Sequence, residues 1–257
     1  MNADKDMTSP PAVLITGASS GIGRALVGQY LANGWQVYAC GRDEGRLDSL
    51  AVDFSEHSAK LCRIGFDVNS RDACLRAAGS LSTPIDLAIF NAGTCEYLDS
   101  PLGFDGELFA RVIETNLISI GYCLEAFLPK LAADGRVALM GSSAALLPLP
   151  RAEAYGASKA ALAYLADTLR IHLASVGAAI SVSLIEPGFV RTPLTDKNDF
   201  PMPGRIEVDD AARRIASALD AGKNRIQFPR RLLWPMKLMA LLPKPLWATL
   251  AKHSVSR

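Results

Sequence analysis

The chain has 257 residues with a formal net charge of +1, and 49% of them are apolar. A chain of this length and composition can bury the core of one α/β domain. The near-neutral charge argues against a nucleic-acid-binding protein, because such domains usually carry a strong basic excess.

Apolar runs bounded by turn residues alternate with helix-period stretches along most of the chain, a pattern typical of stacked βαβ units. Strands are predicted, in chain order, at 13–16, 36–40, 60–66, 87–90, 136–140, 180–185 and 225–228. Helices are predicted at 21–31, 46–54, 71–78, 108–131, 155–175 and 208–221. The sequence therefore predicts an α/β fold with about seven strands in a parallel sheet, covered by helices on both faces.

A glycine-rich turn, Thr-Gly-Ala-Ser-Ser-Gly-Ile-Gly over 16–23, joins the first predicted strand to the first helix. The first-turn N–H groups of a helix are unpaired and its dipole adds positive charge there, so a pyrophosphate fits. Glycine lets the backbone approach phosphate closely. The alternative is a turn that uses glycine for packing only.

Tyr155 and Lys159 are four residues apart on a predicted helix, which puts a phenol and an ammonium on one face. A unit charge about 4 Å away would lower the pKa of the phenol by about 3 at an effective dielectric of 20. Tyr155 could then exchange a proton near neutral pH. A surface pair at this spacing is the alternative, and it is disfavoured by the glycine turn upstream.

Together these motifs resemble the short-chain dehydrogenase/reductase family in its compact single-domain form, over 11–230. The resemblance rests on the glycine turn, Asn91-Ala92-Gly93, Asn116, Ser142-Ser143, the Tyr155 and Lys159 pair and Pro187-Gly188. It implies a Rossmann-type doubly wound sheet and hydride transfer between a nicotinamide and a carbonyl or secondary alcohol. The alternatives are a catalytically idle dinucleotide-binding sensor or scaffold, and a sugar epimerase or dehydratase, whose C-terminal domain is usually larger.

The resemblance also implies roles for individual residues. Tyr155 is the acid/base, Lys159 grips the nicotinamide ribose, and Asn116 holds a water that connects Lys159 to solvent, unless Asn116 is simply a polar helix residue. Ser143 is expected to hold the substrate oxygen. The family usually places this serine thirteen residues before the tyrosine, which fits Ser142, but the second serine of such a pair normally fills the role. Choosing Ser143 requires a one-residue deletion within 146–153.

The expected cofactor contacts come from several turns of the predicted sheet. They are Gly17, Ser19, Ser20, Gly21, Ile22, Gly23, Arg42, Asp67, Val68, Asn91, Ala92, Gly93, Tyr155, Lys159, Pro187, Gly188, Val190 and Thr192.

The end of the second strand bears on cofactor choice. An NAD enzyme usually has an acidic residue there to accept from the adenosine ribose, whereas a 2′-phosphate calls for a basic one. Here Gly41 takes the acidic position and Arg42 follows. A guanidinium can contact phosphate with two hydrogen bonds, so NADP(H) is favoured over NAD(H). Asp43 and Glu44 could instead pair with Arg42.

No metal site is predicted. The five cysteines lack CxxC spacing, and the three histidines lie far apart and outside an HExxH pattern. We expect the thiols to be buried and reduced. Cys95 follows the Asn-Ala-Gly turn and could lie near a pocket, although a small apolar role is favoured.

We predict a disordered polar tail over 1–10, one domain over 11–230 and an appendix over 231–257. The chain starts without the apolar segment of a secretory signal, so a cytoplasmic protein is expected.

Eight of the 27 basic residues and none of the 26 acidic residues lie within 221–257, and this stretch also holds Trp234 and Trp247. Three interpretations of the appendix stay open: an oligomer or core contact, a lid over a lipophilic substrate, and a surface for anionic membrane. Pro235, Pro243 and Pro245 are expected to interrupt a long amphipathic helix. A homo-oligomer with a small-molecule substrate is expected.

Overall fold

The computed structural model describes residues 10–252 and contains a seven-stranded sheet in the order β3-β2-β1-β4-β5-β6-β7. Neighbouring strands pair in parallel throughout. The strands are β1 Ala12–Thr16, β2 Gln36–Gly41, β3 Leu61–Gly65, β4 Ile85–Phe90, β5 Leu131–Met140, β6 Ser181–Pro187 and β7 Arg225–Phe228. The predicted parallel α/β fold is confirmed. The tail predicted at 1–10 lies, except for Pro10, outside the described residues.

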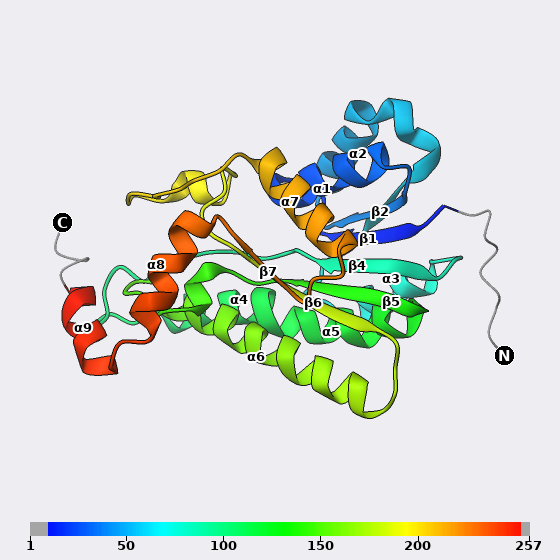
Figure 1. Cartoon of the computed structure of the whole chain (residues 1–257). Helices are drawn as coiled ribbons and strands as arrows, with labels where there is room; N and C mark the ends of the chain where they lie inside the picture. Colours follow the sequence, from blue (N-terminus) through cyan, green and yellow to red (C-terminus); the bar gives the residue numbers. More distant parts are fainter. Residues whose placement is uncertain (1–9, 253–257) are drawn as a thin grey trace.

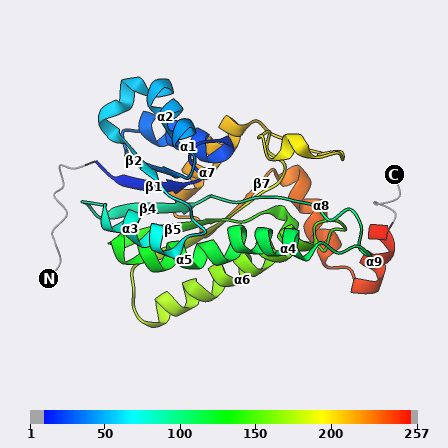
Figure 2. The ribbon, with the colours of Figure 1, turned by 180° about the vertical axis from the view of Figure 1, so that it is seen from behind.

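Two helical layers cover the sheet (Figures 1 and 2). One contains α1 Gly21–Ala32, α2 Glu44–Asp53 and α7 Val208–Asp220, and the other contains α3 Arg71–Gly79, α4 Gly106–Ile113, α5 Ser119–Phe127 and α6 Glu153–Ser175. Each layer has its own apolar core. Val13 and Ile15 of β1 point into the core under α1 and α7, while Leu14 points into the core under α5 and α6. This alternation follows from the two-residue period of a strand.

Side-chain caps set the beginning of several helices. Asp43 accepts a hydrogen bond from the backbone N–H of Arg46 at 3.0 Å, so α2 begins two residues earlier than the predicted start at 46. Asp105 caps α4 in the same way, by accepting from Leu108 N–H at 2.8 Å. An acidic side chain before the first turn satisfies one of the free N–H groups of a helix.

The single helix predicted over 108–131 is wrong. The chain forms α4, a π-helical turn over Glu114–Ile118, then α5, and a short 3₁₀ turn over Leu128–Lys130. Pro129 lacks the N–H that would continue the helix, so α5 ends before it. The chain then enters β5 at Leu131, five residues before the predicted start, and the β4 pairing shifts register there.

The appendix forms two further helices, α8 Arg230–Ala240 and α9 Lys244–Lys252. The expected interruption at Pro235 is not observed, since this proline lies inside α8, whereas Pro243 separates the two helices. Both helices pack on the domain. Leu233 and Met236 of α8 and Ala251 of α9 are buried, and Trp247 Nε1 donates to the backbone oxygen of Pro148 at 2.9 Å.

The order of the strands determines where a ligand can bind. The chain passes from β3 at one edge to β4 beside β1, so the direction of winding reverses between β1 and β4. In open α/β sheets, ligands bind at this reversal, outside the carboxyl ends of the strands. Within residues 10–252, no helix has the length and the apolar character needed to cross a bilayer.

Candidate active site

The glycine turn packs directly against the segment that follows β4. Gly17 has φ +64°, and a Cβ there would lie 2.9 Å from the Cα of Ala92. A Cβ on Gly23 would lie 2.2 Å from the backbone oxygen of Gly17. Asn91 Nδ2 donates to the backbone oxygen of Thr16 at 3.0 Å, and the Thr16 hydroxyl accepts from Asn91 N–H at the same distance. Only glycine permits this approach, so the turn forms a cradle into which a dinucleotide phosphate fits.

A cavity of about 200 Å³ extends from this cradle to the predicted catalytic pair. It brings together most of the predicted site residues, namely Gly17, Ser20, Gly21, Ile22, Asn91, Ala92, Gly93, Tyr155, Lys159, Pro187, Gly188, Val190 and Thr192, and it is also lined by Ser142, the alternative to the predicted Ser143. A Cβ on Gly21 would lie 3.2 Å from Thr192 Cγ2, so the turn and the segment after β6 face each other. Seven other predicted residues do not line this cavity: Ser19, Gly23, Arg42, Asp67, Val68, Asn116 and Ser143.

Lys159 is held inside the protein by a main-chain atom. Its side chain is buried, and Nζ donates to the backbone oxygen of Met140 at 2.8 Å. The same Nζ lies 5.7 Å from the centroid of the Tyr155 ring, as expected for neighbours one turn apart on α6. Burial lowers the pKa of Lys159 from 10.5 to about 8, because an ammonium loses its hydration.

The phenol of Tyr155 behaves differently from the sequence-based expectation. Burial raises the pKa of Tyr155 above its ordinary value, and a hydrogen bond with Ser142 opposes this rise. The predicted lowering by Lys159 is therefore not found in the protein alone, where the loss of hydration is the largest influence on the pKa of the phenol. At neutral pH the phenol keeps its proton.

The structure brings Ser142, and not Ser143, next to Tyr155. Ser142 lines the cavity and hydrogen-bonds with Tyr155. Its extended backbone (φ −165°) also makes it the N-cap of a short 3₁₀ turn, in which its Oγ accepts from Ala144 N–H at 3.1 Å. Ser143 is the first residue inside that turn, is buried, and does not line the cavity. The thirteen-residue spacing thus fits without a deletion.

Asn116 lies in the π-helical turn, where the wider winding shifts its side chain relative to a regular helix. Its Oδ1 accepts from Thr94 N–H at 2.8 Å, and its Nδ2 donates to the Thr94 backbone oxygen and to Ser158 Oγ. A Cβ on Gly93 would lie 3.0 Å from Asn116 Oδ1 and 3.6 Å from Lys159 Nζ. Asn116 therefore fixes the turn that covers the lysine.

Arg42 lies at the end of β2, outside the cavity. Asp43 is engaged with Arg46, through the cap and an ion pair at 3.2 Å, and Arg42 has no ion pair within the described part of the chain. A Cβ on Gly41 would lie 3.6 Å from Ser19 Oγ, so Ser19 and Arg42 flank the same glycine. Asp67 is used locally, because its carboxylate accepts from the N–H of Asn69 at 2.9 Å.

Comparison with known proteins identifies the chain. Residues 11–201 match the sequence model of the short chain dehydrogenases. The protein belongs to this family. It is an NAD(P)-dependent oxidoreductase that acts on CH–OH and C=O groups.

Among its relatives is an uncharacterized oxidoreductase of Myxococcus xanthus, 33% identical over 93% of this chain and 96% of the relative. 11-beta-hydroxysteroid dehydrogenase 1A of Arabidopsis thaliana is also 33% identical, and the match covers 79% of this chain but only 59% of that protein. A short-chain dehydrogenase of Burkholderia phymatum in complex with NAD has the same fold, with a TM-score of 0.81 at 22% identity over 91% of this chain and 94% of that one. A serine dehydrogenase complexed with NADP+ has a TM-score of 0.74 at 26% identity, and the match covers 84% of this chain and 94% of that one.

The dehydrogenase also has residues near Tyr155 that sequence reasoning did not assign to the site. Cys95 is close enough to Tyr155 and Lys159 to raise the pKa of each, and it hydrogen-bonds with Tyr97. Burial raises the pKa of both the thiol and the Tyr97 phenol. The position of Cys95 just after the Asn-Ala-Gly turn was the available signal. The general expectation of buried thiols is wrong for Cys62, which is exposed.

An aromatic cluster continues from Tyr97. The Tyr97 and Phe200 rings meet edge to face with centroids 5.3 Å apart, and Phe189 follows at 6.1 Å from Phe200. Arg151 joins the two loops involved, because its guanidinium pairs with Asp99 at 2.7 Å and with Asp199 at 3.0 Å. An aromatic cluster thus extends away from Tyr97, and the ion pairs of Arg151 fasten the loops that carry it.

Proposed function

We propose that this dehydrogenase interconverts a lipophilic carbonyl compound and its secondary alcohol with NADP(H), and that Tyr155 is the proton donor and acceptor. The observation that carries the proposal is the position of Tyr155. It lines, together with Ser142 and Lys159, the cavity that starts at the glycine cradle. A hydroxyl, a phenol and an ammonium beside a dinucleotide cradle are the groups needed to move a proton next to a hydride.

Each polar residue has a distinct task in this proposal. The nicotinamide, when bound, supplies or accepts the hydride. Ser142 donates a hydrogen bond that holds the substrate oxygen, and Tyr155 donates its proton to the same oxygen. The raised pKa keeps the phenol protonated, which is the form that reduction requires. The Lys159 ammonium then stabilises the phenolate that remains, and Met140 and Asn116 keep the surrounding turns in place.

The choice of NADP(H) rests on the end of β2. Gly41 offers no carboxylate to a ribose hydroxyl, and the Arg42 guanidinium is free of carboxylate partners among residues 10–252. The Ser19 hydroxyl lies close to Gly41, 3.6 Å from where a Cβ on this glycine would be. A free guanidinium next to a hydroxyl suits a 2′-phosphate.

The proposed preference for a lipophilic substrate rests on the aromatic cluster near Tyr155. The cluster of Tyr97, Phe189 and Phe200 offers aromatic surface on the side of the site next to Tyr155. Aromatic walls with a few convergent polar groups are typical of sites for apolar small molecules.

The test begins with a screen of NADPH oxidation against apolar and polar aldehydes and ketones. On the best substrate, we expect Tyr155→Phe to lower turnover about 100-fold or more, because it removes the proton but little volume. Binding of NADPH, followed by fluorescence, should be retained. Near-normal turnover of this variant would refute the mechanism, and absence of turnover in the whole screen with intact NADPH binding would favour the idle sensor.

A further inference from the structure

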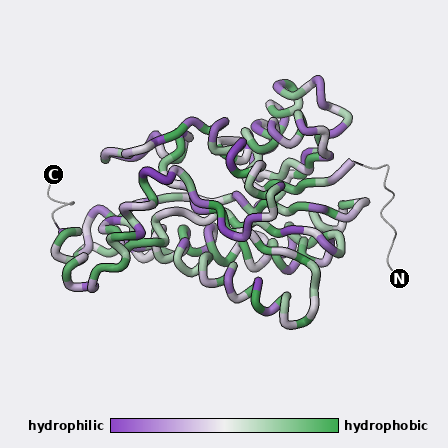
Figure 3. The backbone as a smooth tube through the Cα atoms, viewed as in Figure 1, coloured by the Kyte–Doolittle hydropathy of each residue, from purple (hydrophilic) through white to green (hydrophobic). Residues whose placement is uncertain are grey.

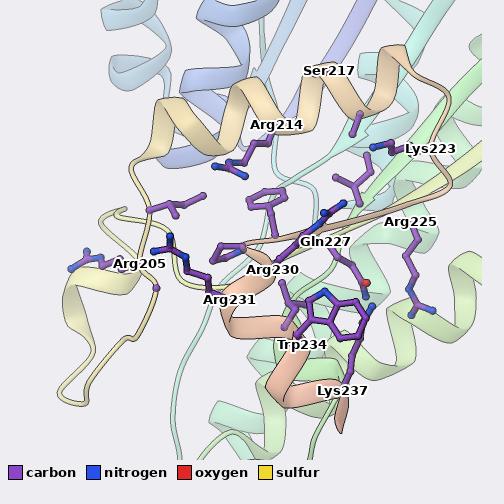
Figure 4. A pocket seen from close by; sticks show the side chains of 17 residues that line it. Arg205, Arg214, Ser217, Lys223, Arg225, Gln227, Arg230, Arg231, Trp234 and Lys237 are labelled. Atoms are coloured by element: carbon purple, nitrogen blue, oxygen red, sulfur yellow. The ribbon is translucent and has the colours of Figure 1, made fainter.

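A second and larger cavity, of about 1090 Å³, lies between α7, β7 and α8 and shares no residue with the active-site cavity. Figure 4 shows α7 on one side of it and α8 on the other. Its charged lining is entirely basic: Arg205, Arg214, Lys223, Arg225, Arg230, Arg231 and Lys237. We call this space the basic cavity. It goes beyond the proposed function, because none of these residues touches the reacting groups.

Only part of this charge is neutralised within the protein. Arg205 pairs with Asp196, Arg214 with Asp210 at 2.9 Å, and Arg225 with Glu186 at 2.7 Å. The remaining cations, Lys223, Arg230, Arg231 and Lys237, have no carboxylate partner within residues 10–252. Arg205 Nε is also buried without a hydrogen-bond acceptor. The basic cavity therefore holds an excess of positive charge.

The N-terminus of α8 adds to this excess. Arg230 and Arg231 occupy its first turn, there is no acidic residue in that turn, and Pro229 provides no side-chain cap. Cations at a helix N-terminus oppose the helix dipole, and the free N–H groups there attract anions. An anion in the basic cavity would neutralise Arg230 and Arg231 and could accept hydrogen bonds from the free N–H groups of α8.

An exposed apolar stripe starts at the same cavity. Trp234, which lines the cavity, is followed by Leu238 on α8 and by Leu241 at the C-cap of α8, at i+4 and i+7, and these side chains are 64%, 61% and 81% exposed. Leu246 and Leu250 of α9 are also exposed. Figure 3 shows hydrophobic and hydrophilic stretches alternating over these two helices. A basic site bordered by exposed Trp and Leu matches an amphiphile with an anionic head.

We propose that this face docks on a membrane that carries anionic phospholipid. The phosphate headgroup enters the basic cavity, and Trp234, Leu238 and Leu241 enter the boundary between headgroups and acyl chains. A free phosphate compound would not account for the apolar stripe. A second copy of the chain would bring a further set of unpaired cations to the same place.

The test is co-sedimentation of the full chain with phosphatidylcholine vesicles that do or do not contain phosphatidylglycerol. We expect binding to the anionic vesicles only, and release as salt rises, because screening shortens the reach of surface charge. R230Q/R231Q should weaken binding about tenfold or more, since each basic residue near such a surface contributes about a factor of five. W234S/L238S should weaken it too. The charge-matched R71Q/R76Q, on α3, should bind as the unmodified protein does.

Three results would overturn the proposal. The first is anionic vesicle binding that is absent or unchanged in R230Q/R231Q. The second is that W234S/L238S binds anionic vesicles normally and that inorganic phosphate displaces the vesicles completely, which would indicate a site for a free anion. The third is a solution mass of a dimer that becomes a monomer in W234S/L238S, which would indicate a second copy on this face. The altered residues are exposed, and circular dichroism of each variant checks its folding.

Discussion

The buried ammonium of Lys159 should make the unliganded protein less stable than it could be, and Lys159→Met tests this. The folded-state pKa of about 8 lies below the ordinary value of 10.5. The unfolded chain therefore binds the proton more tightly, and stability rises as pH increases from about 8 towards 10.5. From these pKa values, burying the charge costs about 3 kcal/mol at pH 7 and less than about 1 kcal/mol at pH 10.

The substitution removes this cost together with the hydrogen bond to the Met140 oxygen. Losing the bond costs about 1 to 3 kcal/mol, largely independent of pH. We therefore expect the free energy of unfolding of the variant, relative to the unmodified protein, to fall by about 2 kcal/mol between pH 7 and pH 10. Urea denaturation without nucleotide, at several pH values, measures it.

A matched control separates this effect from the loss of a positive charge in general. Lys197 is exposed, so Lys197→Met should shift the free energy of unfolding little at any of these pH values. The reasoning fails if the difference caused by Lys159→Met is constant from pH 7 to pH 10, or if it grows with pH.

Three further predictions concern the turns of the site. Ser142→Ala should lower kcat about 100-fold, because one hydrogen-bond donor to the reacting oxygen is lost, while Ser143→Ala should change kcat less than about threefold. If steady-state rates show the larger loss for Ser143→Ala, then Ser143 and not Ser142 holds the substrate oxygen. Arg42→Ala should weaken NADPH binding about 10-fold to 150-fold and hardly affect NADH binding. Titrations that show equal losses of affinity for the two cofactors, or tighter binding of NADH than of NADPH by the unmodified protein, would reject the NADP(H) assignment. Gly23→Ala should abolish nucleotide binding, because the added Cβ would overlap the backbone oxygen of Gly17. In the control Gly121→Ala, in α5, the added Cβ would have no neighbouring atom within 4 Å, so urea denaturation should show a protein more stable by about 0.5 to 1 kcal/mol. A Gly23 variant that binds nucleotide normally contradicts the cradle.

The features that could be predicted from sequence were those set by local pattern. The glycine turn, the strand before it and the helix after it follow from residues adjacent in the chain. Tyr155 and Lys159 share a face because a helix repeats every 3.6 residues. The parallel sheet followed from apolar runs separated by helix-period stretches, and the strand at 225–228 was predicted with its observed ends.

The features that could not be predicted depend on three-dimensional context. Which serine of the pair reaches Tyr155 depends on the extended backbone of Ser142 at a cap, and no spacing rule specifies that conformation. The pKa of Tyr155 was misjudged because an estimate from two charges omits burial. Tyr97 comes from a loop nearly sixty residues before Tyr155, and nothing in the sequence near it indicates that the two are close.

The partner of Lys159 is a backbone oxygen, and this leaves residue 140 open to substitution. That oxygen is positioned by β5, in which Met140 pairs with Ile185 of β6, and it is present whatever side chain residue 140 has. Met140 also lines the active-site cavity, and its side chain belongs to the buried core under α1 and α7, so an apolar residue is needed there. A library of apolar residues at position 140 could therefore reshape the cavity while the lysine keeps its acceptor, which makes this position a good starting point for altering which substrates the enzyme accepts.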